Sequence, residues 1–255
     1  MTDVHPAAAA GFAAAADVYE RARPSYPQDA VDWIVERAGL RPGRVVVDLA
    51  AGTGKLTRLL VPSGAEVVAV EPVPEMRAKL EEVVPGVSAL YGTAERLPFA
   101  DGSADVVTVA QAFHWFDHER ALAELHRVLR PDGLLVLVWN SRDLDDPLQR
   151  ALEELLAPLR DGPPAQEESA WRDPLEASAL FGPIETRRFR YEQAFTAQDL
   201  VDRVHSTSFV ATMRPIDREE LLVRVRALAH GLAEPFRFPY LTEVHTIPRS
   251  RDRAR

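Results

Sequence analysis

The sequence predicts an α/β fold: a doubly wound, mostly parallel sheet of seven strands, with helices on both faces and a late antiparallel strand. Short β-branched runs alternate with helical segments through the first 140 residues. These runs are apolar throughout, as is typical of parallel strands that are covered on both faces. No internal repeat or linker divides the 255 residues, so we expect one domain in which the later strands complete the sheet.

The first half of the chain contains five of the seven expected strands. A helix that begins at Pro27 and stops at Gly39 precedes them, because apolar side chains recur there at helical spacing. Apolar spacing predicts further helices after each of the first two strands, and a later one with Leu122, Leu125 and Leu129 on one side, closed by the turn 131–133. The five strands are expected at 45–49, 67–70, 87–91, 105–109 and 134–139.

The second half is less regular. It contains a Pro-, Gly- and Glu-rich stretch at 161–168, and we expect a mobile loop there. Two strands are expected, at 184–191 and at 236–244, and we expect the second to be antiparallel. Helices are expected at 148–159, 198–205 and 218–230, with a small N-terminal helix at 7–16 and a frayed tail at 249–255.

Composition narrows the classes of partner. With 30 Lys and Arg against 39 Asp and Glu, the net charge is −9, and no overall positive field attracts nucleic acid or anionic lipid. We therefore expect neither nucleic acid nor membrane as a partner. The absence of cysteine suits a reducing compartment, and the sequence has no 18-residue apolar run, so we expect a cytoplasmic protein.

A glycine turn between the first strand and the next helix is the main functional signal. A Walker A loop needs a glycine where Leu49 stands and a serine or threonine where Leu56 stands, so that motif is excluded. A dinucleotide fingerprint needs glycine or alanine where Thr57 stands, and Asp48 would lie beside a pyrophosphate. S-adenosylmethionine has no phosphate and carries cationic groups, so an acidic residue at the strand end favours it.

The segment from Asp48 to Gly54 resembles the motif Asp-x-Gly-x-Gly-x-Gly of the class I S-adenosylmethionine-dependent methyltransferases, in their small-molecule, type 11-like branch. Ala50 takes the place of the first glycine, and we expect the turn to need only a small side chain there. The resemblance implies a Rossmann-like fold and S-adenosylmethionine as cofactor. It also implies that Asp48, Ala50, Gly52, Thr53 and Gly54 bind that cofactor.

Further motifs extend the resemblance over residues 19–139. Glu71 ends the second strand where the family has an acid that binds both ribose hydroxyls, and Pro72 follows it. In the loop after the third strand, the resemblance leaves open which group meets the adenine amine. The remaining expected cofactor residues are Tyr19 and Arg23 in an N-terminal lid, Thr93, Ala94 and Glu95 in that loop, and Ala110 and Gln111 after the fourth strand.

The segment after the fourth strand is where the resemblance places the chemistry. Methyl transfer requires alignment and exclusion of water, and a base only when the acceptor must lose a proton. His114 is the candidate base; its alternative role is to orient the backbone or to pack under the neighbouring aromatic rings. Phe113 and Trp115 are candidate substrate-binding residues, and core packing is their alternative. His114 and His118 do not form a convincing metal motif, so no metal is expected.

These observations together predict a methyltransferase acting on a small-molecule acceptor. A cofactor-binding protein without transfer activity remains an alternative, as does an NAD-dependent oxidoreductase. The oligomeric state and the identity of the acceptor stay open. We expect a single domain, 1–255, made of a lid segment (1–29), a cofactor-binding core (30–140), substrate-side helices and closing strands (141–248) and a tail (249–255).

Overall fold

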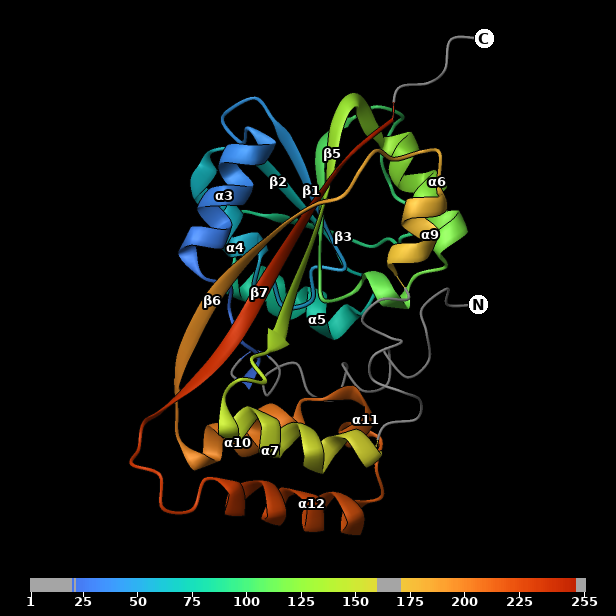
Figure 1. Ribbon diagram of the computed structural model, residues 1–255. Helices are drawn as coiled ribbons and strands as arrows, with labels where there is room; N and C mark the ends of the chain where they lie inside the picture. Colours follow the sequence, from blue (N-terminus) through green and yellow to red (C-terminus); the bar gives the residue numbers. More distant parts are fainter. Residues whose placement is uncertain (1–19, 21, 160–170, 251–255) are drawn as a thin grey trace.

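The computed structural model describes residue 20, residues 22–159 and residues 171–250. Its centre is one seven-stranded sheet with the strand order β3-β2-β1-β4-β5-β7-β6 (Figure 1). All neighbouring strands are parallel except β7, which runs antiparallel to both β5 and β6. The predicted fold class and the late antiparallel strand are therefore confirmed. The strands are β1 (Val45–Leu49), β2 (Glu66–Val70), β3 (Ser88–Leu90), β4 (Ala104–Ala110), β5 (Leu129–Arg142), β6 (Glu185–Phe195) and β7 (Phe236–Pro248).

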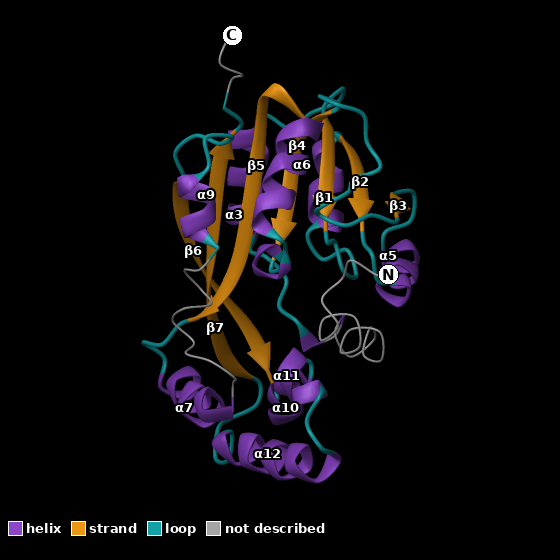
Figure 2. Cartoon of the chain, turned by 90° about the vertical axis from the view of Figure 1, so that its right-hand side faces the viewer, coloured by secondary structure: helices purple, strands orange, loops and turns teal. Residues whose placement is uncertain are grey.

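Helices cover both faces of the sheet (Figure 2). Helices α3 (Gln28–Ala38) and α4 (Thr57–Leu60) pack on one face, where apolar side chains such as Ile34 and Leu60 meet Val46 and Val136. Helix α5 (Pro74–Val83) packs against β2 through Leu80. Helices α6 (His118–Val128) and α9 (Arg172–Ala177) join the apolar cluster of the opposite face. Successive strand residues point to opposite faces, which explains why both sides of the strands are apolar.

Four further helices form a separate layer, which we call the cap. It consists of α7 (Pro147–Leu156), α10 (Ala197–His205), α11 (Ser208–Ala211) and α12 (Pro215–Leu228). Figure 1 shows the cap beyond the carboxyl end of β5, next to the far ends of β6 and β7. Its apolar cluster includes Leu156, Leu200 and Phe238 and shares no residue with the clusters of the sheet faces. The cap therefore has a core of its own, next to the carboxyl ends of the parallel strands.

Two short 3-10 helices extend elements of the sheet layer and the cap. They are η1 (Val61–Ser63) after α4 and η3 (Ala157–Leu159) after α7. A third, η2 (Phe113–Trp115), connects β4 to α6. Among the described residues, no helix has both the length and the apolar character needed to cross a membrane.

Some boundaries differ from the expectation. Helix α6 ends at Val128, and Leu129 already pairs with Ala104 at the start of β5 instead of belonging to the helix. The register then shifts so that Leu134 pairs with Val106, which accommodates the expected turn within the strand. Strand β6 extends to Phe195 because its last residues pair with the start of β7 beyond β5, where polar residues interrupt the apolar pattern. Strand β7 extends to Pro248 because residues 245–248 pair with residues 134–137 of β5 inside the sheet.

The expected frayed tail is partly wrong. The Arg249 N–H donates to the Gly133 carbonyl at 2.9 Å, and the Ser250 N–H donates to the Leu180 carbonyl at 2.9 Å. These two residues therefore continue the ordered path of β7. The rest of the expected tail, the N-terminal helix at 7–16 and the loop at 161–168 lie outside the described residues.

Candidate functional site

The turn after β1 has a left-handed backbone at three positions. Ala50, Gly52 and Gly54 have φ values of 53°, 58° and 81°. A Cβ on Gly54 would lie 2.9 Å from side-chain atoms of Leu80 and Val84, so this glycine lets the turn approach α5. A Cβ on Gly52 would meet nothing within 4 Å, so the space beside this backbone is open. The expectation that position 50 needs only a small side chain is thus incomplete, because it also needs a left-handed conformation.

Asp48 lies at the end of β1 with only 1% of its surface exposed. Its two carboxylate oxygens accept hydrogen bonds from the Thr57 hydroxyl at 2.5 Å and from the Thr108 hydroxyl at 2.6 Å. Burial raises the pKa of Asp48 to about 6, against the lowering effect of these two hydrogen bonds. The carboxylate therefore connects β1 to α4 and β4. Asp48 also lines a cavity, which is described later in this section.

Glu71 follows β2 and holds the glycine turn from the other side. One carboxylate oxygen accepts from the Gly52 N–H and the other from the Val73 N–H, both at 2.8 Å. Burial raises the pKa of Glu71 to about 7, although these backbone donors and Arg77 lower it. A carboxylate has about four lone-pair sites, so two remain for donors of a ligand. Pro72, the next expected cofactor residue, lies half-buried directly after Glu71.

The lid segment is fastened to the glycine turn through Glu20. Its carboxylate accepts from the Thr53 hydroxyl at 2.5 Å and from the Arg58 guanidinium at 2.6 Å. Its backbone carbonyl accepts from Lys55 Nζ at 2.6 Å. Burial lowers the pKa of Lys55, and the nearby Glu20 carboxylate partly restores it. Lys55 therefore binds the lid, a role that the sequence motif did not reveal because its partner lies 35 positions away.

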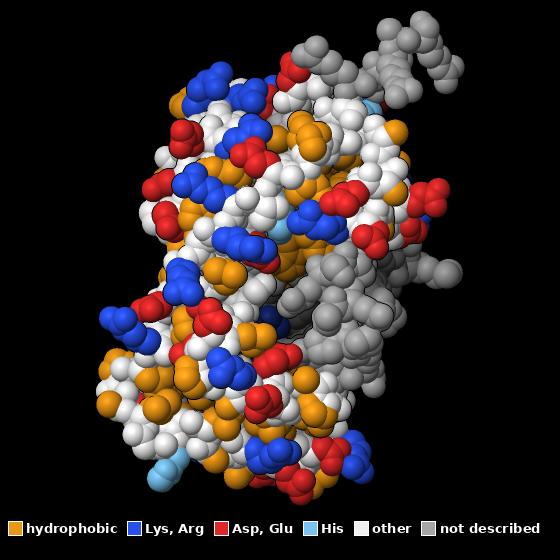
Figure 3. Space-filling model, in the orientation of Figure 1, with side chains coloured by type: hydrophobic (Ala, Val, Ile, Leu, Met, Phe, Trp, Pro, Cys, Tyr) orange, Lys and Arg blue, Asp and Glu red, His pale blue; other side chains and the backbone are white. Residues whose placement is uncertain are grey.

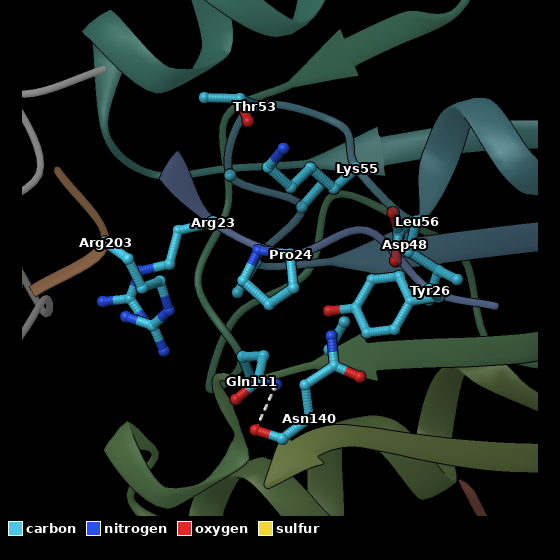
Figure 4. Close-up of a pocket in the computed structure, with 14 residues that line it drawn as sticks. Arg23, Pro24, Tyr26, Asp48, Thr53, Lys55, Leu56, Gln111, Asn140 and Arg203 are labelled. Atoms are coloured by element: carbon cyan, nitrogen blue, oxygen red, sulfur yellow. Dashed lines mark hydrogen bonds between the residues drawn. The ribbon is translucent and has the colours of Figure 1, made fainter. Parts of the chain in front are cut away.

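A cavity opens between the glycine turn, the lid and the cap (Figure 4). Figure 3 shows the surface hollowed between the sheet layer and the cap, with a basic side chain visible at depth. The Arg23 guanidinium donates to the Ser206 carbonyl at 2.8 Å, which ties the lid to the cap. The lining residues are Arg23, Pro24, Tyr26, Asp48, Ala50, Ala51, Gly52, Thr53, Lys55, Leu56, Ala110, Gln111, Asn140 and Arg203.

Seven of these lining residues were not predicted as site residues. Five of them lie inside the segment 19–139 that carries the resemblance, namely Pro24, Tyr26, Ala51, Lys55 and Leu56, whereas Asn140 and Arg203 lie outside it. The Asn140 amide donates to the Ser25 carbonyl at 2.9 Å, and its oxygen accepts from the Thr242 hydroxyl at 2.6 Å. Asn140 thus connects the lid to β7. Arg203 lies on α10, far from every motif in the sequence. Asn140 lies near the carboxyl end of β5 and Arg203 lies on α10, and the tertiary fold brings both to the cavity, so no motif identified them.

The loop after β3 contains three of the expected cofactor residues. Backbone hydrogen bonds between Thr93 and Arg96 close it into a tight turn, and Ala94 is buried in it. The Thr93 hydroxyl is buried and has no hydrogen-bond partner within the described residues, so it can receive a ligand donor or acceptor. Glu95 instead accepts from the Asp117 N–H at 3.0 Å and connects this loop to the start of α6.

The segment after β4 brings Ala110 and Gln111 to the cavity wall. Gln111 has a φ of 60°, a left-handed conformation that is costly for a residue with a side chain and is often retained at functional sites. His114, in η2, is an exposed residue and does not line this cavity. Desolvation of the ring, with His118 and Arg23 nearby, lowers the pKa of His114 to about 4. His114 is therefore neutral at pH 7.

Phe113 is a correction to the sequence analysis. Its side chain is fully buried, stacks on His118 at 5.1 Å between ring centroids and meets Trp171 edge to face. It packs in the core below η2 and cannot touch a substrate in this structure. Trp115 is half-buried, with its ring 4.8 Å from that of His114. Tyr19, the other expected lid residue, lies outside the described residues.

No group of three or more His, Asp or Glu side chains that could hold a metal ion occurs among the residues that the structure describes. The cavity is instead lined by backbone, arginines and a lysine, together with polar and small side chains around one buried carboxylate. This arrangement offers hydrogen-bond donors and acceptors to an organic ligand.

Comparison with known proteins adds an independent result. Residues 47–137 match the family model described as a methyltransferase domain. The chain is 42% identical over 234 residues to an uncharacterized methyltransferase of Mycobacterium tuberculosis, covering 88% of this chain and 91% of that one. It is 44% identical over 116 residues to the demethylmenaquinone methyltransferase of Thermus thermophilus, covering 43% of this chain and 51% of that one.

A solved structure from Anaeromyxobacter dehalogenans, named a type II methyltransferase, has the same fold. It superposes with a TM-score of 0.66 at 25% identity, covering 90% of this chain and 97% of that one. The sheet order, the glycine turn after β1 and these likenesses agree. The chain belongs to the class I S-adenosylmethionine-dependent methyltransferases and is a methyltransferase enzyme.

Proposed function

We propose that this methyltransferase moves a methyl group from S-adenosylmethionine to a small-molecule acceptor by in-line displacement. One observation carries the proposal: the open backbone at Gly52 adjoins two buried carboxylates, Asp48 and Glu71, at the carboxyl edge of the sheet. A cofactor with ribose hydroxyls and cationic groups, and without phosphates, is compatible with carboxylates at this position. A pyrophosphate would be repelled by them.

The donor and acceptor groups fit such a cofactor. The free lone pairs of Glu71 can accept the two ribose hydroxyls, and the buried Thr93 hydroxyl can meet the adenine edge together with the backbone of Ala94. Arg23 can bind the cofactor carboxylate. The proposed cofactor-binding residues are Tyr19, Arg23, Asp48, Ala50, Gly52, Thr53, Gly54, Glu71, Pro72, Thr93, Ala94, Glu95, Ala110 and Gln111, with Glu95 acting through its contact with Asp117.

When bound, S-adenosylmethionine supplies an electrophilic methyl group on a sulfonium. The chain then has to align the acceptor and exclude water. The hydrogen bonds of Glu20 with Thr53 and Arg58 hold the lid over the glycine turn, which helps to exclude water. His114 is neutral at pH 7 and can accept a proton from an acceptor that carries one, while Trp115 beside it can line the acceptor path.

The position of the site supports a small acceptor. The cavity lies between sheet and cap, with the lid bound to both, which suits a molecule that is enclosed rather than a macromolecule. The net charge of −9 is unfavourable for nucleic acid. The Thermus relative is named for a quinone substrate, which is a small molecule. We further propose the division into lid, core, cap side and tail given above, and a cytoplasmic location on the basis of the cysteine-free composition.

Calorimetric titration with S-adenosylmethionine, S-adenosylhomocysteine and NAD tests the cofactor, after any co-purified ligand has been removed. Micromolar affinity for the first two, about −8 kcal/mol, is expected, with no heat from NAD. Binding of NAD alone would refute the proposal. Transfer of label from methyl-labelled cofactor to a small molecule distinguishes an enzyme that acts on such acceptors from one that requires a macromolecule.

A further inference from the structure

Helix α12 is apolar on two opposite faces. Leu221 and Val225 are buried in the cap core. Ile216 and Val223 are 58% and 66% exposed, and Ala227 is exposed as well. At 3.6 residues per turn, these three residues lie within about 40° of one another, on the side opposite the buried pair. A helix face that meets only water is mostly polar, so this exposed apolar stripe indicates a contact surface.

The stripe is accessible because α12 is the outermost helix of the cap. Figures 1 and 2 show α12 at the end of the molecule, with α7 and α10 between it and the sheet. A groove between α10 and α12 runs along one side of the stripe, and its apolar lining includes Val201, Leu222 and Val223. The stripe and this groove therefore form one surface on the outside of the cap.

Charged side chains flank the stripe in a regular order. Glu219 and Arg226 lie on one side of it and Glu220 and Arg224 on the other, and all four are exposed. Within the described residues none of the four forms an ion pair, and Arg226 donates a hydrogen bond to the Gln198 side chain. Each flank thus has its acid in the first half of α12 and its arginine in the second half.

This order of charges fits a second copy of α12 that runs antiparallel. Across a twofold axis, two residues lie opposite each other when the mean of their positions falls at the axis. The means are (219 + 226)/2 = 222.5 and (220 + 224)/2 = 222, so one register pairs the acids of both flanks with arginines. The same register brings the two Val223 side chains together. A parallel arrangement would place like charges opposite each other.

We propose that α12 is a self-association surface, through which two copies of this chain form a twofold-symmetric dimer with antiparallel α12 helices. No residue of α12 lines the cavity, so each copy keeps its own site. An anionic membrane is a poorer partner, because Glu219 and Glu220 flank the stripe and the net charge is −9. An unrelated protein would not require the charges of both flanks to share one midpoint.

The first test reverses the charges and measures association of the full chain by sedimentation equilibrium, at about 1 to 200 µM. The wild type is expected to dimerise in this range. Glu219→Arg with Glu220→Arg makes both flanks basic, and Arg224→Glu with Arg226→Glu makes both acidic. Each double variant alone should associate at least about tenfold more weakly than the wild type. An equimolar mixture of the two should recover the dimer, because every introduced arginine then meets an introduced glutamate.

A matched control makes the same change of net charge on another helix. Glu75 and Glu81 are exposed acids of α5, so Glu75→Arg with Glu81→Arg should leave dimerisation unchanged. Circular dichroism of all three double variants should match that of the wild type.

The second test uses the absence of cysteine from the chain. In the proposed register, the two copies of position 223 are offset by about 2 Å along the helices and those of position 216 by about 19 Å. Disulfides need Cα atoms within about 7 Å. Oxidation with diamide should therefore cross-link Val223→Cys into a dimer and leave Ile216→Cys monomeric. This test needs no charge reversal, so it decides the question even where those variants fail to fold.

Four results would overturn the inference. These are a wild type that stays monomeric throughout the range, dimers of unchanged affinity in both charge-reversed variants, a mixture that does not associate, and equal cross-linking through positions 216 and 223. Cosedimentation of a monomeric wild type with vesicles of phosphatidylcholine and phosphatidylserine, lost in Val223→Glu, would assign the stripe to a membrane instead.

Discussion

The glycine turn and the cap side of the cavity differ in how completely the protein itself satisfies their polar groups. At the glycine turn, every carboxylate oxygen of Asp48 and Glu71 accepts a hydrogen bond from the protein itself. On the cap side of the cavity, Arg203 Nε is buried without a hydrogen-bond partner in the described part of the chain. The polar groups of the glycine turn are therefore satisfied within the protein, whereas the cap side keeps a buried donor that the described residues do not satisfy.

The two regions are also supported by different apolar clusters. The turn is supported by apolar clusters on both faces of the sheet, and the cap by a cluster that includes no residue of those faces. Only the long strands β5, β6 and β7 belong to both layers. Under the proposed function, the sheet layer binds the cofactor, and the cap is a separately packed layer next to the same cavity.

The largest expected effect is at Glu71. Glu71→Ala removes the acceptor for two ribose hydroxyls and also the partner of the Gly52 N–H, so cofactor affinity should fall about 100-fold, or roughly 2.7 kcal/mol. Calorimetry with S-adenosylhomocysteine measures this loss. An exposed acid on α5, Glu75, provides the control variant Glu75→Ala. Unchanged affinity in Glu71→Ala would exclude the residue from the cofactor site.

The raised pKa of Glu71 leads to a second prediction, about how the affinity for the cofactor depends on pH. Its value of about 7 in the free protein means that much of the group is protonated below pH 7, while a ligand with hydroxyl donors favours the ionised form. Affinity should therefore rise by up to about tenfold per pH unit below pH 7 and level off above it. Glu71→Gln should remove this dependence. The free energy of unfolding of the free wild type, relative to that variant, should decrease from about pH 4.5 to 7, because the folded state binds the proton more tightly than the unfolded state.

A substitution in the cap core should destabilise the cap without destabilising the sheet. Leu200 is fully buried in the cap cluster, and Leu200→Ala should cost about 2 kcal/mol or more there. Amide hydrogen exchange should accelerate about 30-fold in α7, α10 and α12, with β1 and β4 still protected. Leu125→Ala, an equal truncation in the cluster under the sheet, should give the opposite pattern. Equal acceleration in both layers after Leu200→Ala would show one cooperative unit.

Local sequence predicted the first region and missed the second for a physical reason. Strand β1, its glycine turn and the acid after β2 are encoded within about 25 consecutive residues, so periodicity and motif could identify them. Asn140 and Arg203 are 203 − 140 = 63 positions apart and line one cavity only through the tertiary fold, which no local pattern encodes. The role of Lys55 was missed for the same reason, since it depends on Glu20 in the lid.

Burial explains the remaining errors. Phe113 lies in a segment rich in aromatic residues next to the site, but residue type alone does not distinguish a cavity wall from a core, and its side chain is fully buried. The strand β5 begins at Leu129 because this residue pairs with Ala104, although its apolar spacing continues that of α6. In both cases tertiary contacts decided between two structures that the local pattern allowed.

His114 lies in η2, outside both regions, and its variant should have a smaller effect. His114→Ala should lower turnover about tenfold and leave the affinity for S-adenosylhomocysteine unchanged, since the residue does not line the cavity of the glycine turn. With a pKa of about 4, the rate should not change through titration of His114 between pH 6 and 8. His230→Ala, at an exposed position beyond α12, is the control. A wild-type rate in His114→Ala would assign the residue to packing against Trp115.

The smallest expected effect concerns the backbone of the glycine turn. Ala50 has a φ of 53°, a conformation that costs an L-residue about 1 kcal/mol and glycine almost nothing. Ala50→Gly also makes the unfolded chain more flexible, which offsets part of the gain, so the free energy of unfolding should rise by only about 0.5 kcal/mol. Thermal unfolding measures it, and Ala51→Gly, at the neighbouring position without a positive φ, should be destabilising by a similar amount. A destabilising Ala50→Gly would mean that the methyl group of Ala50 supports the turn, and the organised state of this region would then depend on side-chain packing as well as on hydrogen bonds.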